Sequence, residues 1–268
     1  MRKKKIYLSN LAWQKKDTNS VIKIIKDHKL NGIDFAPLQI TNNWKNIIEK
    51  TYSYSKYLKK NKIKVNAIQG IFYKKNFRLF LKNNNLHNLI NHMKIIIKLC
   101  KILNSQKIVI GSSEFRNKFK LKTDDADVIF IDFFNQILPL LKKNNIFICL
   151  ETIPKEYNET YLYKYDHAVK LVKKINSKYL KINFDTSIFH FQKLNFEKFK
   201  RNIKLVKNIQ ITEKNFQHFN KPSKKNILFC KKLKKLKQIN SLSIEIISKK
   251  TNISLIEISL KKINKLLT

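Results

Sequence analysis

Glycine is nearly absent from this chain, with only three among 268 residues, at positions 32, 70 and 111. An open nucleotide-binding sheet normally carries a glycine-rich loop after its first strand. Here the segment LSNLAWQKK follows the first β-rich run and contains no glycine, which disfavours that class of protein. The three glycines open or end β-rich runs, so we expect them at backbone positions that tolerate little else.

Cysteine is equally scarce, and no long apolar run is present. Cys100, Cys149 and Cys230 are scattered, without the spacing of a zinc site or a redox motif. They are expected to be small buried side chains in a reducing compartment. No apolar run is long enough to cross a bilayer, and IYLSNLAW, which follows the basic first residues, is too short and polar for a signal-peptide core. A cytoplasmic location is therefore expected.

Acidic residues are scarce. The chain has 18 Asp and Glu against 57 Lys and Arg, which gives a formal net charge of +39. Such a charge is typical of proteins that bind nucleic acid or an acidic membrane surface. However, most of the excess is lysine rather than arginine, it is spread along the predicted helices, and it accompanies abundant asparagine and isoleucine. We attribute it mainly to codons rich in A and T, although anionic substrates would be attracted in either case.

What the sequence does contain is a repeated alternation of short β-branched runs with longer amphipathic ones. Strands are predicted at 6–10, 32–36, 64–69, 107–111, 146–151, 179–185, 207–211 and 241–247. Helices are predicted at 18–30, 43–60, 84–104, 123–144, 161–175, 192–205, 223–237 and 252–267. About eight such units without a linker predict an α/β fold, a single (β/α)8 barrel domain over residues 1–268. A doubly wound open sheet is the alternative.

Polar side chains end most of the predicted strands, at the mouth where such barrels carry their active sites. They are Asn10, Asp34, Gln69, Glu151, Asp185, Gln210 and Glu245. Three of these are acids from separate strands, in a chain where acids are scarce. Converging carboxylates indicate a divalent metal, proton transfer, or both.

An ordered series of segments then resembles a known family. The segments are LSNLAW, GIDFAP, NAIQGIFY, IVIGSSEFRN, LETIPKEYNETYL, INFDTS, IQITEKNF and LSIEII. They are similar to those of the xylose isomerase-like TIM barrels, the sugar phosphate isomerase/epimerase superfamily that also includes type-IV AP endonucleases. The resemblance spans most of the chain. It implies a metal-dependent sugar or sugar-phosphate isomerase or epimerase.

The resemblance also implies residue roles. Glu151 and Glu245 match the two glutamates that bind the metal and exchange the substrate proton, and Asp185 matches the aspartate ligand. Gln210 stands where the family usually has a histidine ligand, and with an amide oxygen in that place Mn²⁺ or Mg²⁺ is expected rather than Zn²⁺. The histidine that ketose 3-epimerases carry three residues after the aspartate is Ile188 here, so that subfamily is not assigned.

Further residues on the same predicted face are candidates for contacts with the substrate. Arg116 and Lys221 are candidates for an anionic group, Tyr157 and Trp13 for packing on a sugar ring, and His218 for substrate or metal. Asn10 and Gln69, at strand ends, complete the set.

Two other functions remain open at this point. The first is a DNA-repair endonuclease of the same superfamily, which the positive charge favours; those enzymes carry additional histidines that the strand ends here lack. The second is a sugar-binding relative without catalysis, which the Gln210 substitution suggests. The sequence leaves the oligomeric state and the phosphorylation of the substrate open.

Overall fold

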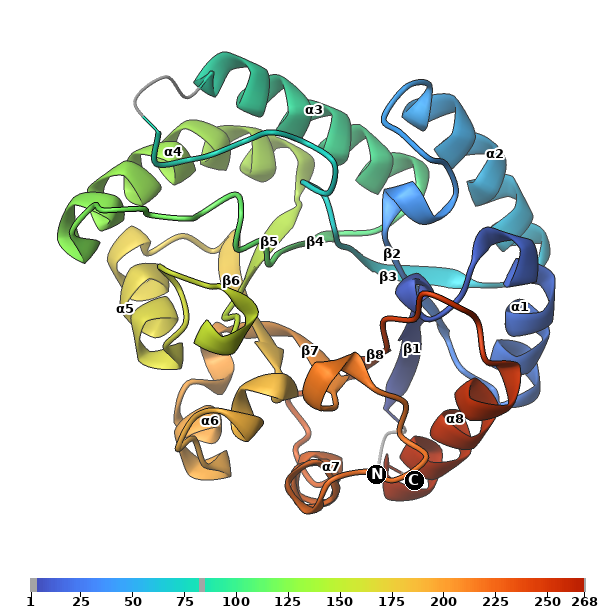
Figure 1. Ribbon diagram of the computed structural model, residues 1–268. Helices are drawn as coiled ribbons and strands as arrows, with labels where there is room; N and C mark the ends of the chain where they lie inside the picture. The colour runs from blue at the N-terminus through green and yellow to red at the C-terminus, as the bar shows by residue number, and fades with distance from the viewer. Residues whose placement is uncertain (1–3, 82–84, 268) are drawn as a thin grey trace.

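The computed structural model of the protein describes residues 4–81 and 85–267, in which eight parallel strands form a closed barrel in chain order (Figure 1). The strands are β1 (Lys5–Ser9), β2 (Gly32–Phe35), β3 (Lys64–Ile68), β4 (Lys107–Ile110), β5 (Phe147–Glu151), β6 (Leu180–Asp185), β7 (Val206–Thr212) and β8 (Ser241–Glu245). The pairing of β1 with β8 closes the ring. The predicted α/β barrel is therefore confirmed.

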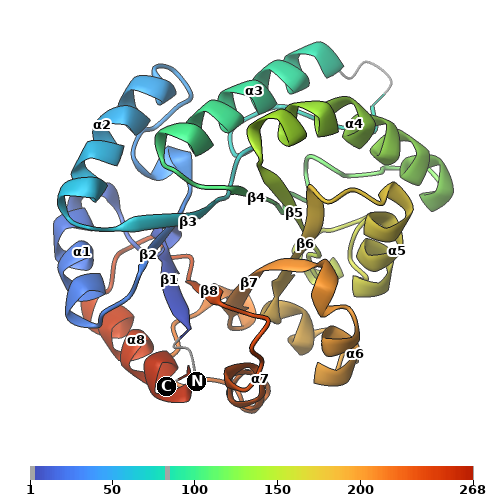
Figure 2. The same cartoon turned by 180° about the vertical axis from the view of Figure 1, so that it is seen from behind.

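A ring of helices surrounds the strands, and both views show α8 lying beside α1 where the ring closes (Figures 1 and 2). The helices are α1 (Thr18–Asp27), α2 (Ile47–Lys60), α3 (Leu86–Ile102), α4 (Thr123–Asn144), α5 (Tyr165–Ile175), α6 (Phe196–Arg201), α7 (Lys224–Lys234) and α8 (Ile253–Leu267). None of these helices is long and apolar enough to cross a membrane.

The helix boundaries differ most from the sequence-based prediction at α6. The prediction placed a helix at 192–205, but the α-helix covers only Phe196–Arg201. The Asn195 side chain accepts a hydrogen bond from the Lys198 backbone amide and caps the start, and a 3-10 turn at Ile203–Leu205 follows the end. The predicted first residue of the third helix, at 84, lies outside the described residues.

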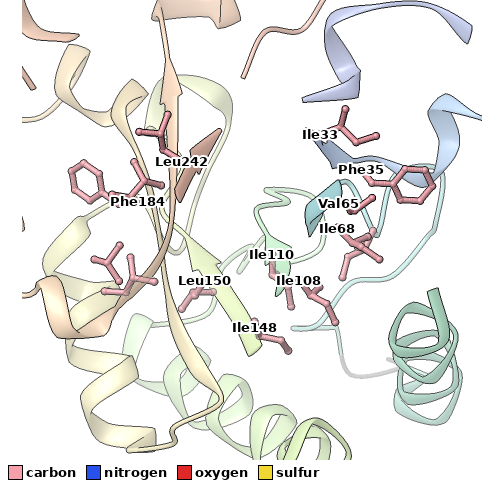
Figure 3. Close-up of a cluster of buried hydrophobic side chains, with 14 of the residues drawn as sticks. Ile33, Phe35, Val65, Ile68, Ile108, Ile110, Ile148, Leu150, Phe184 and Leu242 are labelled. Atoms are coloured by element: carbon pink, nitrogen blue, oxygen red, sulfur yellow. The ribbon is translucent and has the colours of Figure 1, made fainter. Parts of the chain in front are cut away.

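The main hydrophobic core lies between the strands and the helices. Figure 3 shows part of this layer, with Ile33, Ile108, Ile148 and Leu242 from four different strands. These side chains are 0% exposed. This burial agrees with the continuous β-branched runs in the sequence, which are typical of strands whose faces are both covered. Cys100, Cys149 and Cys230 are free and buried, which confirms the expectation that they are buried apolar side chains.

Irregular pairing in two strands brings polar side chains to the barrel axis. Between β2 and β3, Ile33 pairs with Val65 and Phe35 with Ile68, so β3 holds one extra residue. Because side chains alternate in a regular strand, this bulge allows Asn66 and Gln69, three positions apart, both to bond to side chains inside the barrel. A similar shift between β6 and β7 occurs just before Asn208.

Candidate metal and acid–base site

Three carboxylates converge at the mouth where the strands end. Glu151 is the last residue of β5, Asp185 of β6 and Glu245 of β8. One ligand atom from each lies within 4.8 Å of the other two. Asp185 and Glu245 are buried, and Glu151 is the most open of the three. The structure therefore brings together the three acids that the sequence placed at strand ends.

Gly111 makes room for one of these acids. It directly follows β4, next to β5, and a Cβ atom built on it would lie 1.5 Å from Glu151 Oε2 and 2.6 Å from Glu151 Cδ. Any side chain at position 111 would therefore displace the Glu151 carboxylate. The sequence indicated that Gly111 occupies a restricted position, and the structure gives the reason.

Asp185 is fixed by two hydrogen-bond donors. The Ser187 backbone N–H donates to Oδ1 at 2.6 Å, and the Thr212 hydroxyl donates to Oδ2 at 2.9 Å. Both oxygens thus have a partner, and the side chain is held at the edge shared by β6 and β7. These bonds lower the pKa of Asp185 but do not outweigh burial, which raises it.

The site is electrostatically crowded with negative charge. Burial is the largest cause that raises the pKa of Glu151 and of Glu245, and the nearby acids raise both further. The charge of Arg116 lowers the pKa of Glu151 but does not outweigh these effects. Three carboxylates this close, two of them buried, cannot all ionise cheaply without a further cation. The arrangement therefore fits a divalent cation, and its oxygen donors match the preference of Mg²⁺ and Mn²⁺.

A cavity of about 240 Å³ opens onto the three acids. Its lining includes Gln69, Tyr157 and Phe216, and the rings of Tyr157 and Phe216 lie 5.3 Å apart. Among the described residues that line it, none is Lys, Arg or His. In a chain with 57 basic residues, this pocket presents only acidic, neutral polar and apolar groups to a ligand.

Of the seven predicted substrate contacts, only Gln69 and Tyr157 line this cavity. Asn10 joins β1 to β2 instead, since its Oδ1 accepts from the Ala36 backbone N–H at 2.7 Å. His218 lies on the loop after β7 with a buried Nδ1. Trp13, which is buried, and Lys221, which is exposed, are likewise absent from the lining.

The structure places Arg116 in a buried ion pair and not in the lining of the cavity, in contrast to the prediction that it contacts an anionic substrate. Its side chain is 0% exposed, and Nε donates to Glu159 Oε2 at 2.7 Å. Glu159 also accepts from the backbone N–H groups of Tyr161 and Leu162. The pair therefore joins the loop after β4 to the loop after β5. In sequence, a lone Arg in a polar loop gave no sign of this buried partner 43 residues away.

Gln210 on β7 lies beside Glu245 but turns its amide nitrogen towards the acid. Nε2 donates to Gln69 Oε1 at 2.7 Å and to Glu245 Oε1 at 3.3 Å, and Oε1 accepts from Asn183. If the amide were turned over, Gln210 Oε1 would face the oxygens of Gln69 and Glu245. Nε2 would then face the Asn183 amide nitrogen. Each buried group left without a hydrogen bond would cost about 1–3 kcal/mol. These bonds oppose the prediction that Gln210 supplies an oxygen ligand to the metal.

Sequence reasoning missed the supporting residues of the site. Thr212 and Ser187 hold Asp185. Asn183 and Asn208 pair with each other two residues deeper in the barrel than Asp185 and Gln210. A signal was present, because polar residues recur at every second position in KINFD and KNIQIT. This period places them on the same side of each strand as the acids.

Comparisons with known proteins agree with this architecture. Residues 22–260 match the family described as xylose isomerase-like TIM barrel. None of the curated proteins compared with the chain matches it by sequence.

Three solved structures illustrate the likeness. A 3-keto-D-glucoside 4-epimerase from E. coli has a TM-score of 0.77 at 14% identity, covering 98% of this chain and 100% of that chain. An AP endonuclease of family 2 from Brucella melitensis has a TM-score of 0.75 at 12% identity, covering 94% and 96%. The IolI protein with a bound zinc atom has a TM-score of 0.68 at 14% identity, covering 98% and 95%.

At these identities the likeness to the solved structures concerns the fold. The family match covers 239 residues, from 22 to 260, and thus most of the chain. By that match, and with the closed barrel it describes, the chain belongs to the xylose isomerase-like TIM barrel family.

Proposed function

We propose that this protein is a divalent-metal-dependent isomerase or epimerase of unphosphorylated sugars. The observation that carries the proposal is the convergence of Glu151, Asp185 and Glu245, from three strands, onto one point at the floor of a sugar-sized cavity. The family contains sugar epimerases, and similar folds include the 3-keto-D-glucoside 4-epimerase. Two glutamates facing one pocket supply the acid and the base that such a reaction needs.

The three acids divide the work between holding the cation and moving the proton. Asp185, with both oxygens hydrogen-bonded, serves as a fixed ligand, while Glu151 and Glu245 bind and also exchange protons. When bound, Mn²⁺ or Mg²⁺ supplies Lewis-acid polarisation of the substrate carbonyl. One glutamate accepts the proton from the carbon beside the carbonyl, and the C–H electron pair moves to give an enediolate. The other glutamate, which begins protonated, gives its proton to the opposite face or to the adjacent carbon, and exchange with solvent restores both glutamates.

The lining of the pocket supports a neutral sugar rather than a sugar phosphate. A phosphate group is normally held by Arg, Lys or backbone amides. No cationic side chain lines the cavity among the described residues, and Arg116, the arginine nearest in sequence to the strand ends, is paired with Glu159. Tyr157 and Phe216 present aromatic surface of the kind on which the apolar face of a sugar ring packs.

The experiment is solvent-exchange labelling. Purified protein is incubated with neutral ketoses and aldoses in deuterated water, with and without Mn²⁺, and deuterium at carbon is followed by NMR. We expect exchange only with the cation, and a loss of about 100-fold or more in Glu151→Gln and Glu245→Gln. Glu197→Gln, an exposed acid on α6, is the matched control and should exchange normally. Exchange that survives in both site variants would refute the acid–base roles.

The endonuclease alternative has one observation in its favour, the charge of +39. Against it, the described lining of the acid pocket contains no histidine to extend the metal cluster. Cleavage of abasic duplex DNA that depends on Glu151, with no exchange on any sugar, would replace the proposal by this alternative. A sugar that raises the melting temperature without exchange would instead indicate a binding protein.

A further inference from the structure

A single row of hydrogen-bonded side chains, the Lys107-anchored file, runs along the barrel axis. It starts at the mouth opposite the acid site and ends at that site. It begins at Lys107, the first residue of β4, whose side chain is buried and whose Nζ donates to Asn208 Oδ1 at 2.8 Å and to Asn66 Oδ1. Asn208 Nδ2 donates to Asn183 Oδ1 at 2.9 Å, and Asn183 Nδ2 donates to Gln210 Oε1.

The file ends on a catalytic acid. Gln210 Nε2 donates to Glu245 Oε1 at 3.3 Å, and Gln69 Nε2 donates to the same oxygen at 3.1 Å. Gln69 in turn accepts from Gln210 and donates to the Ser9 hydroxyl at 2.7 Å. Glu245 Oε1 therefore faces two amide N–H donors.

The two ends of the file fix its direction. Lys107 Nζ donates at one end and Glu245 Oε1 accepts at the other, whereas an amide has one donor group and one acceptor and can be turned over. Lys107 requires the oxygen of Asn208, which leaves its nitrogen for Asn183, and the same reasoning continues to Gln210. Asn66 is pinned twice, with its oxygen on Lys107 and its nitrogen 2.6 Å from Asp34 Oδ1.

We propose that Gln210 is a positioning residue, which the Lys107-anchored file holds with its N–H group on Glu245, and that it is not a ligand of the metal. A metal ligand would need Oε1 to face the acids. That would require Asn183 and Asn208 to turn as well, until an NH₂ group met the Lys107 ammonium. The buried lysine at one mouth thereby determines which atom of Gln210 reaches the reacting carboxylate at the other.

The consequence for the reaction rests on the proposed function. Two N–H donors hold one oxygen of Glu245 still, so its other oxygen is left for the cation and the substrate proton. Without these hydrogen bonds the Glu245 carboxylate would no longer be held in one orientation, and proton transfer would slow. The three acids would keep their affinity for the cation.

The test compares Lys107→Met, Gln210→Met and the double variant, with Lys64→Met as the matched control. Lys64 is also the first residue of its strand but is exposed. We expect both single variants to lower kcat about 10- to 100-fold, with KM and the Mn²⁺ dissociation constant changed less than about threefold. The double variant should be no worse than either single one, because the residues act as one unit. The control should match the wild type.

Two readouts keep the test independent of turnover and of folding problems. The first is the concentration of free Mn²⁺, measured by EPR. The second is the Gln210 side-chain amide, observed by ¹⁵N NMR in the metal-free protein. Its protons should be protected from exchange with solvent in the wild type and should exchange readily in Lys107→Met. Burial raises the pKa of Asp34, and the charge of Lys107 lowers it without outweighing burial. If Lys107→Met folds poorly because Asp34 loses this nearby charge, Asp34→Asn with Lys107→Met removes both charges and should reproduce the phenotype.

Three results would overturn the proposal. The first is Mn²⁺ binding weakened about tenfold or more by Gln210→Met alone. The second is a loss of kcat in the double variant that equals the product of the two single losses. The third is a Gln210 amide signal that is unchanged in Lys107→Met. Absence of sugar exchange in the wild type would refute the proposed function, but the metal-affinity and NMR measurements would still decide the role of Gln210.

Discussion

At the scale of single residues, glycine placement carries as much information about the site as the acids do. Gly32 has φ +153° and a Cβ there would meet the Lys64 backbone oxygen at 1.8 Å, so the backbone itself excludes a side chain. At Gly111, by contrast, the obstacle is the carboxylate of Glu151. One glycine is therefore needed for the barrel and the other for the chemistry.

This difference gives a prediction for Gly111→Ala. The displaced group is the flexible end of Glu151, so we expect the free energy of unfolding to change by less than about 1 kcal/mol. The carboxylate would move by an ångström or more, and such a misplacement costs about 100-fold in rate. Sugar exchange and thermal unfolding, measured together, check the two parts.

Gly70→Ala is the matched control for that substitution. Gly70 has φ +63° and a Cβ would have an ordinary 3.6 Å contact with Ala36 Cβ. An alanine there is strained by roughly 1–2 kcal/mol. Gly70 also lines the cavity, but its Cβ would contact only Ala36 and no acid. We expect lower stability with nearly normal exchange, the reverse of Gly111→Ala. Full activity in Gly111→Ala would contradict the role assigned to that glycine.

At the scale of elements, the sequence predicted the strands well and the side-chain contacts across loops poorly. Continuous β-branched runs mark strands such as β4 and β5, because both faces of each strand are covered. The acids at the ends of β5, β6 and β8 were predictable for the same reason, since parallel strands bring their ends to one mouth. The bulge in β3, which brings Gln69 to Glu245, depends on pairing with β2 and leaves no periodic signal.

The loops after β4 and β5 contain a contact between residues far apart in the chain, which the local sequence does not predict. This contact gives a second prediction. Arg116 and Glu159 form a fully buried ion pair. Arg116→Met leaves the Glu159 carboxylate buried without its cation, and we expect a loss of about 3–5 kcal/mol in the free energy of unfolding. Denaturant titration measures it.

The double variant Arg116→Met with Glu159→Met separates structure from substrate binding. It removes both charges, so most of the stability should return. If Arg116 bound an anionic group of the substrate, KM would rise in the double variant even though the protein is stable again. We expect KM to change less than about threefold.

At the scale of the whole molecule, the two mouths of the barrel have opposite electrical character. The acid pocket has three carboxylates and no cation in its described lining. The other mouth opens into a hollow of about 1540 Å³ whose described lining has ten lysines and no acid: Lys5, Lys56, Lys59, Lys62, Lys64, Lys107, Lys178, Lys181, Lys204 and Lys207. Composition alone supplies many lysines, but the fold keeps them away from the carboxylates.

Among the described residues only eight ion pairs form, three of them through histidine. With 57 basic and 18 acidic residues, the excess of +39 has no acidic partner within the protein. Self-repulsion of a large net charge destabilises the compact state, and salt screens it over a Debye length of about 10 Å at 0.1 M.

Raising NaCl from low concentration to about 0.3 M should therefore stabilise the protein. We expect a gain of roughly 1–2 kcal/mol in the free energy of unfolding, or about 2–6 °C in Tm for a chain of this size. Because the effect is screening, KCl should act equally, and sucrose at matched osmolality should not reproduce the dependence on ionic strength. A Tm that falls as NaCl is added would mean that attractive pairs outweigh repulsion, and the excess lysines would then have to be counted as structural partners.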